Sequence, residues 1–124
     1  MPSPSIIDLV RRSRSRDYRI IQGATWARMF SFPSDWGADW TGFAARAEFR
    51  RGPRTRNPQV LATARATIID PGPTNRIVHL VLDADITAAI IDKRGTWDLE
   101  IYNGSVVLRI AQGQWHLSEE TTAQ

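Results

Sequence analysis

The sequence of 124 residues contains no cysteine, only two histidines and a single lysine, Lys93. Without cysteine the chain forms no disulfide or thiolate zinc site and has no cysteine nucleophile. The histidines, His79 and His116, are far apart and lack metal-ligand spacing. No apolar run approaches the roughly 18 residues of a membrane span, and the first residues lack the pattern of a signal peptide. These absences favour a protein made in a cytoplasm, with no metal and no cofactor.

Motifs of known catalytic sites are missing as well. The sequence has no glycine-rich phosphate loop, nucleophile elbow or calcium loop. Asp83 and Asp85 precede a short helical stretch, where helix capping is a better interpretation than paired catalytic carboxylates. Asp98 and Glu100 share one face of a predicted strand, where two like charges suit water or arginine partners. The sequence therefore predicts that the protein is not an enzyme and has no catalytic residue.

Alternation of apolar and polar residues predicts that most of the chain is β-structure. It is clearest over residues 43–50, where Phe43 and Phe49 share a face with two alanines and the other face is mostly charged. The further predicted strands are 18–22, 26–32, 60–69, 76–82, 96–102 and 106–117, with one helix at 83–90. This pattern predicts an all-β fold: an immunoglobulin-like antiparallel β-sandwich of seven or eight strands with one short helix.

A hairpin is expected to close this fold. Asn103-Gly104 is the strongest short signal for a two-residue turn. The turn fixes the register of the two strands, so their apolar residues should face one core. The residues predicted to do so are Trp97, Leu99, Ile101, Val106, Leu108 and Ile110. Gly113 predicts a β-bulge further along the return strand.

Basic residues are concentrated in the first half of the chain. Residues 1–56 carry 11 basic and 5 acidic groups, a balance of +6, whereas residues 57–124 carry 5 and 8, a balance of −3. One basic cluster lies in residues 11–19 and the other in residues 46–56. Residues 1–16 differ in composition from the rest, which predicts an extended N-terminal arm before a domain of residues 17–124. The two clusters are either solvated or bind an acidic partner surface.

Five tryptophans are present, and two of them have open roles. Trp26 and Trp97 lie on predicted strands with apolar neighbours and are assigned to the core. Trp36 and Trp40 flank a loop next to Asp35 and Asp39. They could stack on a sugar, serve as protein-interface residues, or be buried if the loop folds back. Aromatic residues among arginines are also typical of proteins that bind single-stranded nucleic acid, but the mixed charge of the chain argues against this function.

The order of several short segments resembles the small β-sandwich domain of tailed-phage virion proteins, the kind found at the N-terminus of baseplate upper proteins. The similarity covers about residues 18–122, including "IIQGATWARMFSF" and "DWTGFAARAEFR". Its motifs are Gln22-Gly23, Thr41-Gly42-Phe43, Arg50, Thr87-Ala88-Ala89, Trp97-Asp98-Leu99-Glu100 and the closing strand from Gly113 to Leu117. In larger relatives a fibre or stem follows this domain, whereas this chain is expected to end with the domain, and this departure puts direct receptor binding in doubt.

The resemblance implies a structural, non-enzymatic virion protein that joins or decorates tail, baseplate or neck proteins. It would be made in the host cytoplasm and stand in the particle in several symmetry-related copies, with no nucleic-acid or membrane partner. The residues predicted for the partner interface are Ile6, Ile7, Leu9, Arg11, Arg12, Arg14, Trp36, Trp40, Arg51, Arg54 and Arg56. The alternative function is a carbohydrate-binding module that uses exposed tryptophans.

Overall fold

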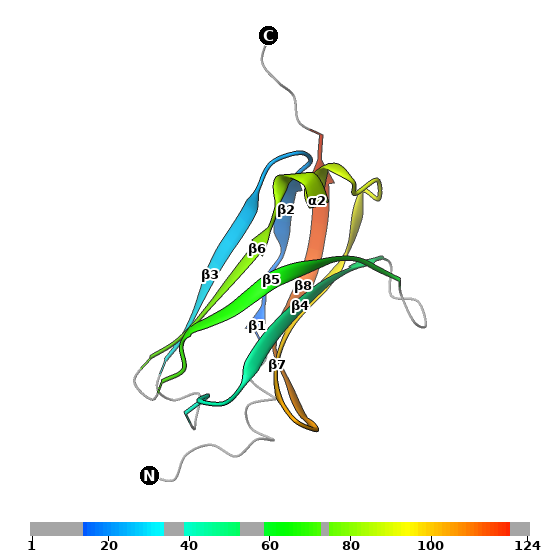
Figure 1. Cartoon of the computed structure of the whole chain (residues 1–124). Helices are drawn as coiled ribbons and strands as arrows, with labels where there is room; N and C mark the ends of the chain where they lie inside the picture. Colours follow the sequence, from blue (N-terminus) through cyan, green and yellow to red (C-terminus); the bar gives the residue numbers. More distant parts are fainter. Residues whose placement is uncertain (1–13, 34–38, 53–58, 73–74, 120–124) are drawn as a thin grey trace.

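The computed structural model describes residues 14–33, 39–52, 59–72 and 75–119. Within these ranges the chain forms eight strands and one short helix (Figure 1). In chain order these are β1 (Arg14–Ser15), β2 (Tyr18–Ile21), β3 (Trp26–Pro33), β4 (Ala44–Arg51), β5 (Val60–Asp70), β6 (Asn75–Leu82), α2 (Ala84–Ala88), β7 (Arg94–Asn103) and β8 (Val106–Ser118). The predicted all-β class with one short helix is confirmed.

The strands form two facing sheets that share β5. Their order is β1-β8-β7-β4-β5-β6-β3, and β2 also pairs with β8. The first half of β5 pairs with β4 and its second half pairs with β6, so β5 crosses from one sheet to the other (Figure 1). The pairing of β3 with β6 in one sheet, and of β4, β7 and β8 in the other, is that of an immunoglobulin-like sandwich. This confirms the predicted fold class.

The core lies between the two sheets and is built mainly from aromatic residues. Trp26 of β3 contacts Phe49 of β4 edge-to-face, with ring centroids 5.3 Å apart. Phe30 of β3 contacts Trp97 of β7 at 5.7 Å. These residues are all buried, and such pairs add to the free energy gained by burying apolar surface. The faces of β3, β4 and β7 that were expected to point into the core are therefore confirmed as buried.

Among the described residues, strand pairing already begins at Arg14, three residues before the predicted start of the domain. β1 and β2 pair in parallel with β8, with Arg14 opposite Ala111 and Tyr18 opposite Trp115. Between the two strands the backbone N–H of Arg16 donates to the carbonyl of Gln112 at 2.9 Å. Residues 14–16 of the predicted arm thus belong to the sheet, and residues 1–13 lie outside the described ranges.

The closing hairpin differs from its prediction by one residue. Asn103 pairs with Val106, so the two turn residues are Gly104 and Ser105 rather than Asn103 and Gly104. Gly104 has a φ of +58°, which glycine adopts at little cost. Val106, predicted to face the core, is 37% exposed. It lies beside the turn, beyond Ile101, which is the last buried residue of β7.

A β-bulge lies in this hairpin, but not at Gly113 as predicted. Glu100 is opposite Arg109 and Leu99 is opposite Ala111, so Ile110 is an extra residue in β8. Ile110 and Ala111 are both buried as a result. The bulge moves every later residue of β8 along by one position, which places Gly113 opposite Trp97.

The helix is shorter than the predicted 83–90, and its cap differs. α2 has five residues, and Asp83 occupies the N-cap position without a side-chain capping bond. The Asp83 carboxylate instead accepts a hydrogen bond from Arg65 at 2.8 Å. The buried Thr87 donates its hydroxyl to the Ala24 carbonyl at 2.8 Å, which fixes the helix to the turn between β2 and β3.

Candidate functional site

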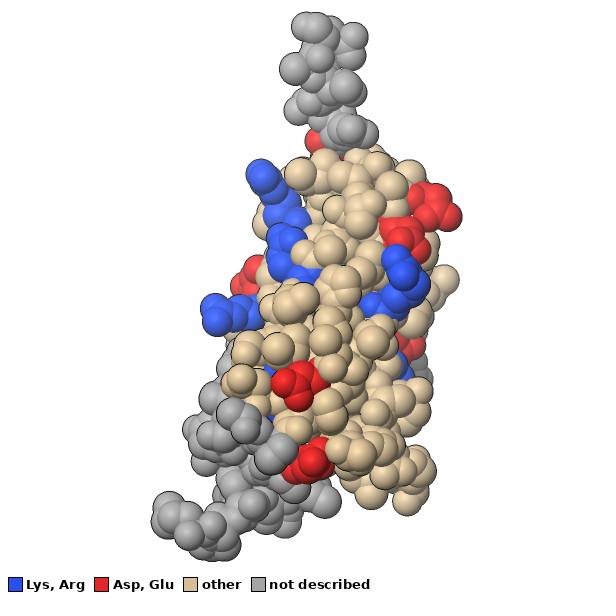
Figure 2. Space-filling view, turned by 60° about the vertical axis from the view of Figure 1, so that its left-hand side comes forward, with Lys and Arg blue, Asp and Glu red and all other residues tan. Residues whose placement is uncertain are grey.

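The outer face of the sheet β3-β6-β5 carries few charges. Its cross-strand rows are Ala27, Val81 and Arg65, then Met29, His79 and Thr67, then Ser31, Ile77 and Asp70. Met29 is 62% exposed, and Ile69 at the end of β5 is also exposed. In the space-filling view of this side, uncharged residues cover most of the surface, and a few separate basic and acidic groups lie among them (Figure 2). The alternation over residues 26–32 already indicates that Met29 is exposed, because Met29 lies on the face of the strand opposite to the one that carries the aromatic residues.

β3 also has a free edge, because within the described residues it pairs only with β6. Pro33 lies in the strand opposite Asn75, and proline has no N–H to donate. Proline is accommodated where its nitrogen points away from the neighbouring strand. By alternation, the backbone groups of Ala27, Met29 and Ser31 point to the same free side. Arg28 already donates to the Ala27 carbonyl at 2.7 Å.

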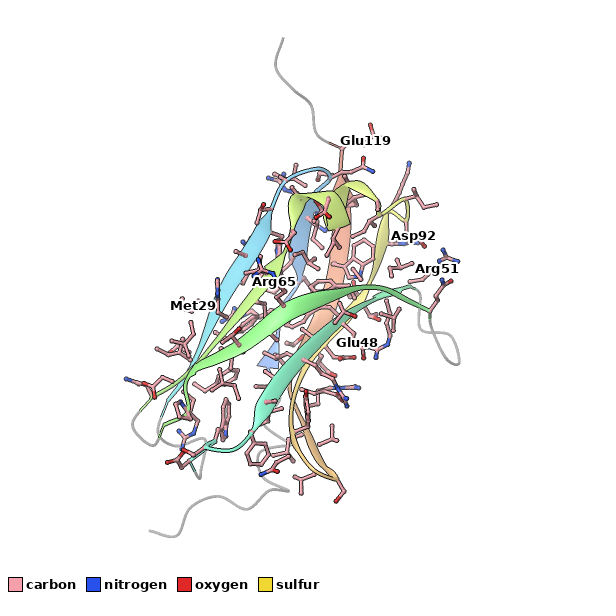
Figure 3. All side chains as sticks on the ribbon, in the orientation of Figure 1. Met29, Glu48, Arg51, Arg65, Asp92 and Glu119 are labelled. Carbon is pink, nitrogen blue, oxygen red and sulfur yellow. The ribbon has the colours of Figure 1, made fainter. Side chains whose placement is uncertain are left out.

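The residues predicted for the interface are not brought together in the described structure. Arg51 at the end of β4 is exposed and donates two hydrogen bonds to the Asp92 carboxylate, at 2.7 and 3.3 Å (Figure 3). Arg14 lies in β1. The other predicted residues, Trp40 apart, lie outside the described ranges: Ile6, Ile7, Leu9, Arg11, Arg12, Trp36, Arg54 and Arg56.

Trp40 belongs to the core and not to an accessible interface, which corrects its predicted role. Its side chain is only 2% exposed. The ring lies 5.3 Å from the ring of Phe32 and 5.7 Å from the guanidinium of the buried Arg76. The backbone N–H of Trp40 donates to the Pro71 carbonyl at 2.7 Å, which holds this segment against the sandwich. Among the alternatives for Trp40, the structure therefore selects burial.

The outer face of β4, β7 and β8 is charged in a regular pattern. Cross-strand pairing places Arg46, Glu100 and Arg109 in one row, and Glu48, Asp98 and Gln112 in the next. Arg50, Thr96 and Gln114 form a third row. Three arginines and three carboxylates therefore lie in these rows of the face, so their formal charges cancel.

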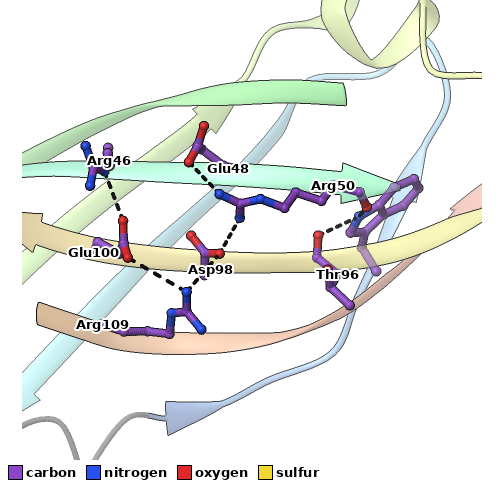
Figure 4. A network of polar contacts seen from close by, with 8 residues as sticks. Arg46, Glu48, Arg50, Thr96, Asp98, Glu100 and Arg109 are labelled. Atoms are coloured by element: carbon purple, nitrogen blue, oxygen red, sulfur yellow. Dashed lines mark hydrogen bonds and ion pairs between the residues drawn. The ribbon is translucent and has the colours of Figure 1, made fainter. Parts of the chain in front are cut away.

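Ion pairs connect these rows (Figure 4). Arg46 donates to Glu100 at 2.9 Å, and Arg50 donates to Glu48 at 2.7 Å and also to Asp98. The guanidinium of Arg109 lies further away, 3.6 Å from Asp98 and 3.8 Å from Glu100. The prediction that Asp98 and Glu100 have water or arginine partners is confirmed for arginine.

Asp98 is the buried centre of this network. The residue is 7% exposed, and its Oδ2 atom faces Arg50 and Arg109. Its Oδ1 atom is buried and has no hydrogen-bond partner. Burial raises the pKa of the Asp98 carboxyl, and this effect exceeds the lowering by Arg50 and Arg109.

A raised pKa in the folded state has a consequence for stability. An acid of this kind binds a proton more readily when folded than when unfolded, so its contribution to stability grows as the pH falls. Wild type should therefore gain stability relative to Asp98→Asn as the pH is lowered from 7 toward the ordinary pKa of 3.8. Thermal melts of both proteins across that range measure the difference, and a difference that is constant with pH would contradict the prediction.

Asp98 is one of the residues that line a polar groove with a volume of about 730 Å³. Ser15 and Asp17, on either side of the break between β1 and β2, also line it. The lining residues are Ser15, Asp17, Arg50, Thr96, Trp97, Asp98, Arg109, Gln112, Gly113 and Gln114. Asp17 is held in place because its carboxylate accepts a hydrogen bond from the backbone N–H of Gln114 at 3.0 Å. The groove combines donors and acceptors on a rigid sheet face.

Two tryptophan–glycine pairs join β7 and β8. Trp97 on β7 is opposite Gly113 on β8, and Trp115 on β8 is opposite Gly95 on β7. The indole N–H of Trp97 donates to the Arg16 carbonyl at 2.8 Å. The indole N–H of Trp115 donates to the Arg50 carbonyl at 3.2 Å and to that of Thr96 at 3.1 Å.

The glycines make this close approach possible. A Cβ atom at Gly113 would lie 1.7 Å from the Arg16 carbonyl oxygen, and one at Gly95 would lie 1.9 Å from that of Arg50. Each indole can therefore hydrogen-bond to a backbone carbonyl on a neighbouring segment only because the opposite strand has no side chain there. The first pair fixes the segment before Asp17, and the second fixes the backbone of Arg50.

The described residues contain no group of three or more histidine, aspartate or glutamate side chains that could hold a metal ion. No helix in the described part of the chain is long and apolar enough to cross a membrane.

No protein-family model and no curated protein sequence matches this chain. Among solved structures, it is similar to the extracellular fragment of novel immune-type receptor 11 from Ictalurus punctatus, with 8% identity, 90% of each chain covered and a TM-score of 0.36. It is also similar to the N-terminal Ig1-2 module of the Drosophila receptor protein tyrosine phosphatase DLAR, with 13% identity and a TM-score of 0.34. That match covers 93% of this chain and 50% of the other.

Proposed function

We propose that this chain is a non-enzymatic structural protein of a tailed-phage virion, which joins or decorates tail, baseplate or neck proteins through protein–protein contacts. The ordered sequence motifs between residues 18 and 122 support the phage assignment, because they resemble the small β-sandwich domain of virion proteins. The observation that carries the binding function is the weakly charged outer face of β3-β6-β5 together with the free edge of β3.

This face has the composition of a protein interface rather than of a solvated surface. Arg65 and Asp70 are the charged residues in its three described rows, and Arg65 is paired with Asp83 at the border. Met29 is exposed in the middle row, which contains Met29, His79 and Thr67 and no acidic residue, lysine or arginine. The opposite face of the sandwich carries six charged residues in its three rows. Apolar exposure without charge marks a contact surface.

The free edge of β3 suggests how a partner binds. An extended segment of a neighbouring virion protein would add a strand to this edge, with main-chain hydrogen bonds for affinity and side-chain contacts for specificity. Its side chains on the outer face would contact Met29. Arg28 caps only one carbonyl of this edge, and its side chain could turn away when a partner strand arrives. Symmetry-related copies would each hold one such segment.

The alternative carbohydrate-binding function loses one of its two tryptophans. Trp40 cannot stack on a sugar while its ring is buried against Phe32 and Arg76. Trp36 lies outside the described residues. In the basic cluster of residues 46–56, Arg51 is less available to an acidic partner than expected, because it already forms an ion pair with Asp92.

Quantitative mass spectrometry of purified phage particles tests the proposed function directly. The chain should copurify with the particles in a fixed ratio to the major tail proteins, in several copies per particle. Its absence from purified particles would contradict the proposal.

Replacing Met29 by lysine should leave the fold intact and lower incorporation into particles. The side chain is mostly exposed, so the change in the free energy of unfolding should stay within about 0.5 kcal/mol. A buried ammonium in the contact would instead weaken assembly strongly. Co-expression of variant and wild type, followed by mass spectrometry of the particles, gives the ratio of incorporation. Val107→Lys, at an exposed apolar position on the other sheet, is the matched control, and equal incorporation of both variants would exclude this face.

A further inference from the structure

A row of basic side chains crosses one end of the charged sheet, beyond the rows that the ion pairs connect. His116 of β8 is opposite Arg19 of β2 on one side and Arg94 of β7 on the other. Cross-strand partners share a face of the sheet, and His116 lies two residues after Gln114, so the three side chains start from the outer face. All three are exposed. We call them the basic row.

The two arginines of the basic row differ from the other arginines of this face. Each arginine of the ion-paired rows has a carboxylate partner. In the described part of the chain, Arg19 and Arg94 form no ion pair. Two strand spacings, about 10 Å, separate their Cα atoms, and both side chains are long enough to reach a common partner above His116.

The carboxylates near the basic row are bound elsewhere or lie outside it. Asp92 pairs with Arg51 on the other side of β7 (Figure 3). Asp17 accepts a hydrogen bond from the backbone N–H of Gln114. Glu119 follows the end of β8 and is exposed (Figure 3). The positive charge of the row is therefore available to a partner from outside the chain.

Two exposed isoleucines lie at the same end of the sandwich. Ile21 of β2 lies one row beyond the basic row and is 40% exposed. Ile91 is 81% exposed, the highest value for a large apolar side chain in the described residues. The carbonyl of Ile90 accepts a hydrogen bond from the side-chain amide of Gln22 at 2.9 Å, which attaches this segment to the end of β2. A partner here would meet positive charge and apolar surface together.

The small extent of the basic row selects the kind of partner. Asp17 and then Asp98 and Glu48 follow toward the middle of the face. A nucleic acid that lay along the strands would meet these carboxylates after a single phosphate contact, whereas its binding depends on several. Two arginines are also fewer than the clusters that hold proteins on anionic membranes. A protein segment with a few carboxylates and apolar residues matches the surface better.

We propose that the basic row and the two isoleucines bind an acidic segment of another protein. Its carboxylates would lie on Arg19 and Arg94, because a guanidinium can donate two parallel hydrogen bonds to a carboxylate. The His116 ring adds a further N–H donor. The apolar side chains of the segment would contact Ile21 and Ile91. This surface lies on the other sheet from β3, so the inference goes beyond the proposed function and does not depend on the presence of the chain in a virion.

A nuclear magnetic resonance titration of the full chain at low ionic strength tests this surface. The probe is a capped hexapeptide of four glutamates and two leucines, and its control has glutamine in place of each glutamate. The acidic peptide should cause saturable shifts of the backbone amides of Arg19, Arg94 and His116, and the neutral peptide should not. Added sodium chloride should weaken the binding, because the charges are exposed.

Single substitutions identify the residues that bind the peptide. Arg19→Ser and Arg94→Ser should each weaken binding about fivefold, as for the loss of one exposed ion pair, and the double variant should not saturate. Arg46→Ser is the matched control, because it removes an arginine of the same face that is already paired with Glu100. It should bind as wild type does. Ile91→Ser should weaken binding without changing its dependence on salt. The amide spectrum of each variant shows that it is folded.

The inference is wrong if the acidic peptide causes no saturable shifts, or if the folded double variant binds it as tightly as wild type does. It is also wrong if Arg46→Ser weakens binding as much as Arg19→Ser. A short single-stranded oligothymidine and vesicles that contain phosphatidylserine are titrated in parallel. Tighter binding of either one to the same amides would overturn the choice of a protein partner. None of these results affects the copurification of the chain with particles.

Discussion

Replacing Gly113 by alanine is expected to destabilise the sandwich strongly, with Gly95→Ala close behind. The new Cβ at position 113 would lie 1.7 Å from the Arg16 carbonyl oxygen and 2.9 Å from the indole nitrogen of Trp97. Overpacking usually costs about 1–3 kcal/mol. Here the clash is with backbone, so the cost should exceed 3 kcal/mol, a large share of the ~5–15 kcal/mol that stabilises a domain. Denaturant unfolding measures this loss.

Gly104→Ala is the matched control for this experiment. Its added Cβ meets no atom within 4 Å, and only the positive φ of the turn opposes it. A left-handed residue of this kind costs about 1–2 kcal/mol. Equal losses at positions 113 and 104 would mean that the segment before Asp17 does not lie against β8 as described.

Trp97→Ala should be the second large loss, at about 3–5 kcal/mol, as for other aromatic truncations in a core. The side chain is 1% exposed and contacts Tyr18, Phe30 and Phe49 from three different strands. Its removal also leaves the Arg16 carbonyl without its indole donor. Trp97→Phe keeps most of the ring and loses the hydrogen bond, so it should cost less. Thermal and denaturant melts compare the three proteins.

Met29→Ala provides the exposed control for Trp97, with an expected change within about 0.5 kcal/mol. If Trp97→Ala were as mild as Met29→Ala, the assignment of β7 to the core would fail, and the sandwich with it.

Most of the strands could be predicted because each sheet has one buried face. Over residues 43–50 the alternation alone identifies Ala47 and Phe49 as core residues, and both are fully buried. The sequence predicts the β-bulge at the wrong residue because no particular residue type marks a bulge. The bulge shows only as a change in which positions of β8 are buried: Leu108 and Ile110 are buried at even positions and Trp115 at an odd one. Trp40 was ambiguous because its burial depends on distant partners, Phe32 and Arg76.

The candidate groove could be predicted only in part. Sequence spacing shows that Asp98 and Glu100 share a strand face and need arginine or water. It does not show which arginines, because that depends on the register between strands. In a hairpin without the bulge, Gln112 would oppose Trp97 and Gly113 would oppose Thr96. The extra residue Ile110 instead places Gln112 opposite Asp98 and Gly113 opposite Trp97, and all four residues line the groove.

The parallel pairing of β2 with β8 also determines the order in which the molecule can be completed. Tyr18 and its neighbours form their sheet contacts only with residues 115–118, at the opposite end of the described chain. Contacts between such distant segments require closure of a long loop and slow down folding. Because synthesis proceeds from the N-terminus, β2 leaves the ribosome early and has no partner strand until β8 follows. β2 is therefore synthesised before β8 but can join the sheet only after β8. The Trp97 indole forms its hydrogen bond to the Arg16 carbonyl only when this part of the chain has docked.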